Sequence, residues 1–334
     1  MVRTCAGRAG DSAKLTRMTK RFVVCGETLI DLIQAGGENE GHVSSTWAAT
    51  SAGGPMNTAV ALGDLGTDVH FLGRLSRDAF GKQLRGHIET AGVALDLATE
   101  SSQATSLAVV SLDAEGKASY TFHFTDTANF GWQEADLPAL AADDWLHIAS
   151  LACVVSPGSD VLLDWAHGVP SGISYDINVR PTVITDPQAY WAKVQPWLRV
   201  VGQRRGILKA SDEDIAFLAQ AVSPGADPLD LLAEWVAQYG IGLGVVTLGP
   251  DGVAAVDAEG NRTTADGFPT TVIDTVGAGD TFMAGFLDGY VNRELDLRSA
   301  LVRGAAAASI VCARRGAQPP NTAEVDALIE ATGR

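Results

Sequence analysis

Strand-like and helix-like segments alternate along most of this 334-residue chain, and this alternation restricts the fold more than any other feature. Strands that alternate with helices imply a mostly parallel sheet with helices on both faces, so the sequence predicts an α/β fold. The central part shows the pattern most clearly. Its predicted strands are WLHIAS (145–150), ISYDIN (173–178), GILKA (206–210) and GVVTLG (244–249), with predicted helices near 158–168, 188–199, 211–221 and 227–239.

The same alternation continues toward both ends of the chain. RFVVCGETLIDLI (21–33) is predicted as one strand, and 55–66 as a helix with proline in its first turn and glycine at its end. VHFLGRL (69–75) is predicted as a buried strand and 78–91 as a helix. After a short hairpin at 252–265, three helices are expected near 278–291, 296–313 and 322–331.

One hairpin interrupts this alternation. Two alternating segments flank AEGK within residues 105–124, which is a hairpin signal. We expect this hairpin and the segment near 33–50 to leave the main body as a small lid. No repeat or long linker divides the chain, so residues 21–334 are expected to form one domain. Residues 1–20 are expected to be a disordered leader, with a transit peptide as the alternative.

Composition narrows the possible functions. The net charge of −16 argues against nucleic acid or an anionic membrane as partner, although a local site can still bind a small anion. The four cysteines are scattered and the six histidines form no metal-binding spacing. This usage indicates a reducing cytoplasm without a disulfide framework. The first 20 residues contain no apolar run long enough for a secretory signal or a membrane span.

The familiar phosphate-binding loops are absent from the sequence. It contains no GxxxxGK[ST] motif, and GIGLGV and GAGDTF both lack the third glycine of GxGxxG. A nucleotide would therefore have to be held in another way.

DTVGAGDTF (274–282) offers such a way. Gly277, Ala278 and Gly279 carry little or no side chain, so their amide N–H groups can approach a ligand at the start of a helix. The positive end of the helix dipole would then hold a transferring phosphoryl group as an anion hole. Asp280 would accept the proton of a substrate hydroxyl. The residues alone leave a second interpretation equally open, in which Asp280 only caps the helix.

A family resemblance favours the first interpretation. DTVGAGDTFMAGFL (274–287) and AGGPMNTAVALGDLG (52–66) resemble the two signatures of the ribokinase-like (PfkB) carbohydrate kinases, and the likeness runs from about Arg21 to the end of the chain. It implies a ribokinase-like three-layer α/β/α fold with a small β lid. It also implies a cytoplasmic enzyme that transfers the γ-phosphate of ATP to a sugar hydroxyl.

The resemblance also implies sugar-binding positions. In this family an aspartate at the end of the first strand binds sugar hydroxyls, and Asp31 matches it. A carboxylate suits that task because it can accept from two neighbouring hydroxyls. The other implied sugar contacts are Gly53, Gly54, Asn57, Asn178 and Arg180. The chain departs from the pattern at Ser76, where the family commonly has glycine.

Nucleotide and metal positions follow from the same resemblance. Thr247, Gly249 and Gly252 match the strand end that lines the ATP channel. Ser211 and Asp214 stand where many members have N-x-x-E, which implies Mg²⁺ held through water near Asp214. The implied monovalent cation site, for K⁺, comprises Asp274 and the carbonyls of Val276 and Gly316, with Pro320 replacing a serine of ribokinases.

Within the family, SYDINVRP (174–181) and TDTANF (125–130) resemble fructokinases, which favours fructose as the sugar. A 2-keto-3-deoxygluconate kinase is the alternative, because Arg180 could pair with that substrate's carboxylate. An alternative of another class is a catalytically silent sugar-binding protein on the same fold. The family analogy also suggests a homodimer.

Overall fold

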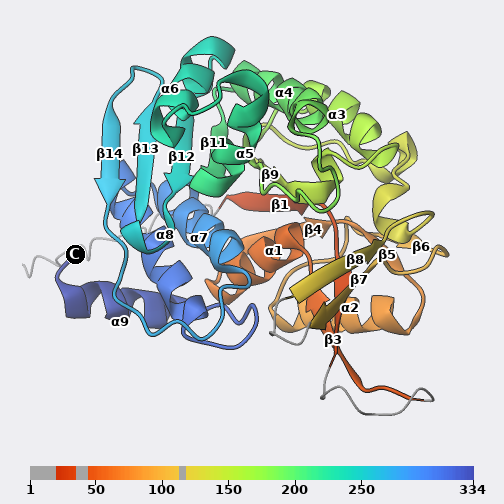
Figure 1. Cartoon of the computed structure of the whole chain (residues 1–334). Coiled ribbons are helices and arrows are strands. Elements are labelled where there is room, and N and C mark those ends of the chain that lie inside the picture. Colours follow the sequence, from red (N-terminus) through yellow and green to blue (C-terminus); the bar gives the residue numbers. More distant parts are fainter. Residues whose placement is uncertain (1–19, 35–43, 113–117) are drawn as a thin grey trace, which may run out of the picture.

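The main sheet sets the geometry of the molecule. The computed structural model describes residues 20–34, 44–112 and 118–334. An eight-stranded sheet has the order β14-β13-β12-β11-β10-β9-β1-β4 (Figure 1). Six of its strands, β12, β11, β10, β9, β1 and β4, are parallel to one another. β13 pairs antiparallel with β12, and β14 pairs antiparallel with β13. Their bounds are β1 (Arg21–Cys25), β4 (Asp68–Leu72), β9 (Trp145–Ala149), β10 (Gly172–Asp176), β11 (Ile207–Ser211), β12 (Leu243–Thr247), β13 (Val253–Asp257) and β14 (Arg262–Ala265).

Helices cover both faces of the main sheet, and each layer buries its own hydrophobic core (Figure 1). Trp197 and Trp235 lie in one core, and Met56 and Phe282 lie in the other. The first layer consists of α3 (Gly158–Gly168), α4 (Pro187–Gln203), α5 (Asp212–Val222) and α6 (Pro228–Tyr239). The second consists of α1 (Gly54–Asp64), α2 (Ala79–Thr90), α7 (Ala278–Leu287), α8 (Leu297–Cys312) and α9 (Thr322–Thr332). The predicted three-layer α/β/α architecture is confirmed.

A four-stranded sheet, here called the small sheet, stands apart from the main sheet (Figure 1). Its order is β3-β2-β7-β8, and β7 and β8 are the hairpin that was expected to leave the main body. The bounds are β2 (Leu29–Gln34), β3 (Trp47–Ala52), β7 (Leu107–Leu112) and β8 (Ala118–His123). Parts of the two predicted lid segments, 35–43 and 113–117, lie outside the described residues, as does the leader up to residue 19.

The prediction of a single strand over 21–33 is wrong. The chain leaves the main sheet after β1 and enters the small sheet at β2, so the two halves of the apolar run belong to different sheets. Gly26 allows this change of direction, because a Cβ at that position would lie 2.3 Å from the Pro55 side chain. Asp31 consequently lies within β2 rather than at the end of the first strand.

VHFLGRL divides in the same way. After β4, the chain forms β5 (Arg74–Ser76), which pairs in parallel with β6 (Thr99–Ser101). The predicted helix 278–291 is also two elements, because α7 is continued by a π-helix at Asp288–Asn292. Short 3-10 helices lie at Ala128–Phe130, Glu134–Asp136, Ser150–Cys153 and Gly249–Asp251.

Among the helices of the described ranges, none combines the length and the apolar character needed to cross a membrane. Cys25, Cys153 and Cys312 are free thiols.

Candidate active site

The start of α7 is built by a glycine in a left-handed conformation. Gly277 has φ 77° and precedes the first helical residue, Ala278. A Cβ on Gly277 would lie 2.6 Å from the Cβ of Ala317, so glycine is required for both conformation and space. The Ala278 N–H donates to the Thr275 carbonyl oxygen at 3.2 Å, so one amide of the expected anion hole already has a partner in this turn.

Asp280 does not cap this helix. It is the third residue of α7, and no side chain accepts a hydrogen bond at the helix start. Its carboxylate instead faces α1 and the end of β10. Oδ2 accepts from Asn57 Nδ2 at 2.9 Å, and Oδ1 accepts from Asn178 Nδ2 at 3.5 Å. The geometry therefore contradicts the capping alternative.

The charge state of Asp280 reflects competing influences. Burial raises the pKa of its carboxyl, while the Asn57 hydrogen bond and the nearby Arg180 and Lys209 act to lower the pKa. The net shift is upward, which makes Asp280 more basic than an exposed aspartate. Such a carboxylate is better suited to accept a proton.

The glycine pair lets α1 approach Asp280. Gly53 precedes α1 with φ 129°, and a Cβ there would lie 2.6 Å from the Glu27 carbonyl oxygen. A Cβ on Gly54 would lie 2.8 Å from Asn178 Nδ2 and 3.1 Å from Asp280 Oδ1. The predicted residues Gly53, Gly54, Asn57 and Asn178 thus meet around Asp280, and Asn57 binds this aspartate directly.

Two residues with left-handed backbone follow neighbouring strands here. Ser150 follows β9 with φ 61°, and Asn178 follows β10 with φ 44°. Both side chains lie close to the position of a Cβ on Gly54. Non-glycine residues adopt such angles at a cost, and they concentrate at functional sites. Ser150 was missed from the sequence, where nothing distinguishes it from an ordinary residue after a strand.

Arg180 links the parts of the site electrostatically. Its Nη1 donates to Asn178 Oδ1, and its backbone N–H donates to the Tyr190 hydroxyl at 3.0 Å. The guanidinium acts to lower the pKa of Asp31, against burial, which raises that pKa to about 6. The same guanidinium influences Asp280. Asp31, on the small sheet, and Asp280, on α7, therefore share one cation.

Glu27 is a buried acid that sequence reasoning missed. Its side chain is 1% exposed, and Oε2 accepts from the Ala152 N–H at 3.0 Å. Burial raises the pKa of Glu27. The sequence does show a carboxylate, Glu27, within the apolar run 21–33. Its importance is not evident when the whole run is predicted as one strand.

The predicted nucleotide residues lie on two neighbouring strand ends. Ser211 and Thr247 are register partners at the ends of β11 and β12. Gly249 has φ 56° and Gly252 φ 96°. A Cβ on Gly252 would lie 2.2 Å from the Ala265 carbonyl oxygen, so this glycine is also needed for packing.

Asp214, predicted to lie near Mg²⁺ held through water, is engaged in hydrogen bonds with the backbone. Its two carboxylate oxygens accept the backbone N–H groups of Val179 and Ser211, each at 2.8 Å, while Ser211 Oγ accepts from the Asp214 N–H. These bonds tie the start of α5 to the segment after β10. Within the described part of the chain, no group of three His, Cys, Asp or Glu side chains is arranged to hold a metal.

The residues expected at the monovalent cation site do come together. Asp274 accepts the Val276 N–H at 3.1 Å and the Gly316 N–H at 2.8 Å. The Gly316 carbonyl accepts from the Gln318 N–H at 2.8 Å. These bonds use some of the oxygen lone pairs that a cation would need.

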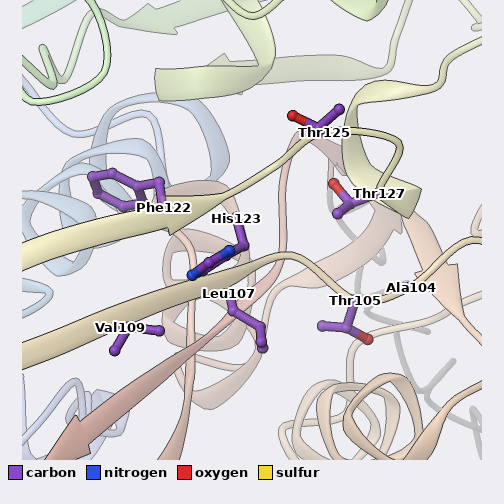
Figure 2. A pocket seen from close by; sticks show the side chains of 8 residues that line it. All are labelled: Ala104, Thr105, Leu107, Val109, Phe122, His123, Thr125 and Thr127. Atoms are coloured by element: carbon purple, nitrogen blue, oxygen red, sulfur yellow. The ribbon is translucent and has the colours of Figure 1, made fainter.

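A pocket of about 420 Å³ lies at the β7–β8 hairpin of the small sheet (Figure 2). Leu107 and Val109 line it, whereas Ala108, the register partner of Asp31, lies between them in the strand. Side chains alternate along a strand, so Leu107 and Val109 lie on the face opposite Asp31.

Comparison with known proteins agrees with this geometry. The model of the pfkB family carbohydrate kinases matches residues 19–324. A fructokinase from Klebsiella pneumoniae is 30% identical over 276 residues, which cover 81% of this chain and 85% of that protein. A fructokinase from Rhizobium leguminosarum bv. trifolii is 32% identical over 271 residues, covering 80% and 78%.

Solved structures show the same likeness. A double mutant of Vibrio cholerae O395 fructokinase, with fructose, ADP and potassium ion bound, has a TM-score of 0.78 at 26% identity, covering 93% of this chain and 98% of that one. Xylella fastidiosa fructokinase with bound ATP has a TM-score of 0.82 at 24% identity, covering 95% and 100%. On these grounds, this chain belongs to the PfkB family of carbohydrate kinases.

Proposed function

We propose that this carbohydrate kinase transfers the γ-phosphoryl group of ATP to fructose and forms fructose 6-phosphate. The observation that carries the proposal is the Asp280 carboxylate, which is buried at the start of α7 and held by Asn57 and Asn178 without capping the helix. The Klebsiella and Rhizobium relatives named fructokinase support fructose as the sugar. The fructose and ADP bound to the Vibrio enzyme support the same substrate pair.

The reaction follows from the residues around Asp280. A sugar hydroxyl oxygen attacks the γ-phosphorus and forms the new O–P bond, while the bond to the β-phosphate oxygen breaks and ADP leaves. Asp280 accepts the hydroxyl proton. The N–H groups of residues 277–279, with that of Ala278 released from the Thr275 carbonyl, and the positive end of α7 stabilise the charge on the transferring group. Mg²⁺, when bound, would neutralise phosphate charge, with phosphate oxygens rather than Asp214 as its main ligands.

Sugar binding is assigned to Asp31 and Arg180, together with the side-chain amides of Asn57 and Asn178 beside Asp280. Asp31 belongs to the small sheet, whereas the other groups belong to the main body. Closure of the small sheet over the sugar would therefore bring Asp31 into place and exclude water, which competes as phosphoryl acceptor. In this proposal the small sheet is the lid.

The test is sugar-dependent release of ADP from ATP and Mg²⁺, measured with fructose, 2-keto-3-deoxygluconate and ribose. The proposal predicts the highest kcat/KM for fructose. Preference for 2-keto-3-deoxygluconate would reassign Arg180 to a substrate carboxylate. Turnover with none of the sugars would support the silent, sugar-binding alternative. K⁺ dependence is measured in the same assay by replacing K⁺ with tetramethylammonium.

A further inference from the structure

A lysine and an aspartate are buried side by side under the start of α7. Lys209 Nζ on β11 donates to Asp176 Oδ2 on β10 at 2.8 Å, and the two side chains are 4% and 1% exposed. The Asp176 Oδ1 atom is buried and, among the described residues, has no hydrogen-bond partner. Lysine and aspartate are rarely buried so completely. In the sequence, Lys209 is only a lysine within the predicted strand GILKA, and nothing there indicates that it pairs with Asp176.

Stability does not explain this pair. Two charges taken out of water lose more hydration energy than one contact restores, unless further hydrogen bonds satisfy them. Asp176 lacks such further bonds on Oδ1. An apolar pair of similar volume would stabilise the fold as well or better. The position of the charges is therefore more informative than their mutual attraction.

The ammonium lies against the catalytic turn. A Cβ built on Gly279 would meet Lys209 Nζ at 3.0 Å, and apart from its two chain neighbours and the backbone of α7, no other heavy atom of the described residues lies within 4 Å of that position. Glycine at 279 thus leaves room for the lysine. Burial acts to lower the pKa of Lys209, but Asp176, Asp214 and Asp280 raise it, so the side chain remains an ammonium.

We propose that Lys209 is a positioning residue for phosphoryl transfer, whose buried positive charge supports residues 277–279 from the side of the main sheet. The cation acts through Gly279 and Asp280 rather than by contact with the sugar. It adds fixed positive charge to the helix start, where negative charge develops in the transition state. It also favours the ionised form of Asp280, which must accept the proton. Asp176 holds the ammonium in this place.

This inference rests on the proposed function, so its test starts from the wild-type protein and the sugar that it phosphorylates best. Lys209→Met removes the charge with similar side-chain length. We expect kcat to fall about 10- to 100-fold, with the sugar KM changed less than about threefold. Lys193→Met is the matched control, because Lys193 forms a 3.0 Å pair with Asp160 on the surface. This control is expected to keep wild-type kcat.

Lys209→Met leaves Asp176 buried without its cation, and this variant can fail to fold. The double variant Lys209→Met with Asp176→Asn removes both buried charges, and its kcat is measured in the same way. A persistent loss of kcat in the folded double variant supports the proposal. Wild-type kcat in the folded double variant would overturn it and leave the pair without a role in catalysis.

A readout independent of turnover separates this inference from the proposed function. Carbon-13 NMR of the Asp280 carboxyl, assigned with Asp280→Asn, gives its titration in the protein without substrate. In Lys209→Met, or in the double variant if the single one does not fold, the titration midpoint is expected to move to higher pH. An unchanged midpoint overturns the inference even if the wild type phosphorylates fructose. A moved midpoint supports it even if another sugar is the substrate.

The interpretation of that titration must include every charged group around the pair. Around Lys209, these groups come from four packed elements and are Asp176 on β10, Asp214 on α5, Asp280 on α7 and His147 on β9. Arg180 also acts on Asp280 and is unchanged in these variants. The difference between wild type and Lys209→Met therefore reports the loss of one cation.

Discussion

The two ends of α7 each bury an aspartate, and the two sites differ in how completely the carboxylate is bound. Asp288, after the last turn, is fully buried and accepts from Asn292 at 2.9 Å, Arg293 at 2.7 Å and Arg303 at 2.8 Å. Asp280, in the first turn, has two neutral amide donors, and the second lies 3.5 Å away.

This difference separates a structural site from a chemical one. At Asp288, two guanidinium groups donate to the carboxylate and hold it in an ion-pair network. At Asp280, burial raises the pKa, and the nearby cations do not bond the carboxylate directly. Left-handed backbone does not separate the two sites, because Ser150 and Asn178 near Asp280 and Glu294 beside Arg293 all have positive φ angles. Asp288 therefore has three donors, two of them charged, whereas Asp280, the proton acceptor in the proposed function, has only two neutral ones.

The largest expected effect comes from Asp280→Asn. This change keeps the shape of the side chain but removes the proton acceptor. We expect kcat to fall about a thousandfold with little change in sugar affinity. Steady-state kinetics with the best sugar measure the change, and sugar affinity is measured by calorimetry. Wild-type turnover in this variant would remove Asp280 from the mechanism.

Gly54→Ala should have the next largest effect. The added Cβ would lie 2.8 Å from Asn178 Nδ2 and 3.1 Å from Asp280 Oδ1, so the Asn178 amide must shift and the carboxylate that it binds must give by a few tenths of an ångström. A displacement of about 1 Å at a catalytic group can cost about a hundredfold in rate. Gly86→Ala is the control, since Gly86 lies within α2 and, apart from its chain neighbours and the backbone of that helix, no heavy atom of the described chain lies within 4 Å of its Cβ position. Equal kcat values for the two variants would contradict the importance of close packing at Gly54.

A smaller effect is expected when a change of pH alters the charge of Asp31 and, with it, the affinity for sugar. Burial raises its pKa to about 6, so the carboxyl is mostly neutral at pH 5 and mostly ionised at pH 7. The ionised form is the better acceptor from sugar hydroxyls, and sugar affinity should rise about tenfold over this interval. Calorimetry without ATP measures the dissociation constant. Asp31→Ala should bind sugar weakly at both pH values; if it keeps the wild-type pH dependence, another group is responsible.

The smallest effect on turnover is expected at the other end of α7. Asp288→Asn removes the charged partner of Arg303 Nε, and Arg303, which is 2% exposed, keeps its ion pair with Asp326. The free energy of unfolding should fall by about 3 kcal/mol. Urea denaturation measures this loss. At a temperature where the variant is folded, kcat should stay near the wild-type value. A large loss of kcat with intact stability would erase the distinction between the two ends.

Much of the fold could be predicted because its causes are local. The apolar runs of β9 to β12 and the helices between them follow from periodicity, and α3 occupies the predicted range 158–168. The error at 21–33 has a tertiary cause. Apolar residues continue through Gly26, and only packing against Pro55 shows that the chain changes sheets there.

The candidate site could be predicted only in part. Signature residues such as Gly54 and Asp280 are close in space, in agreement with the prediction from the two motifs. The partners of Asp214 could not be anticipated, because spacing does not reveal that Val179 and Ser211 occupy both oxygens. Lys209 was likewise overlooked, since its meaning depends on how β11 lies beneath Gly279.

The most direct test of the central claim is a crystal structure of the protein with fructose and a non-hydrolysable ATP analogue. The account predicts a fructose hydroxyl within about 3 Å of an Asp280 carboxylate oxygen, in line with the γ-phosphorus. It also predicts γ-phosphate oxygens on the amides of residues 277–279. A γ-phosphate bound elsewhere, with Asp280 still held by Asn57 and Asn178 and far from the sugar, would contradict the claim.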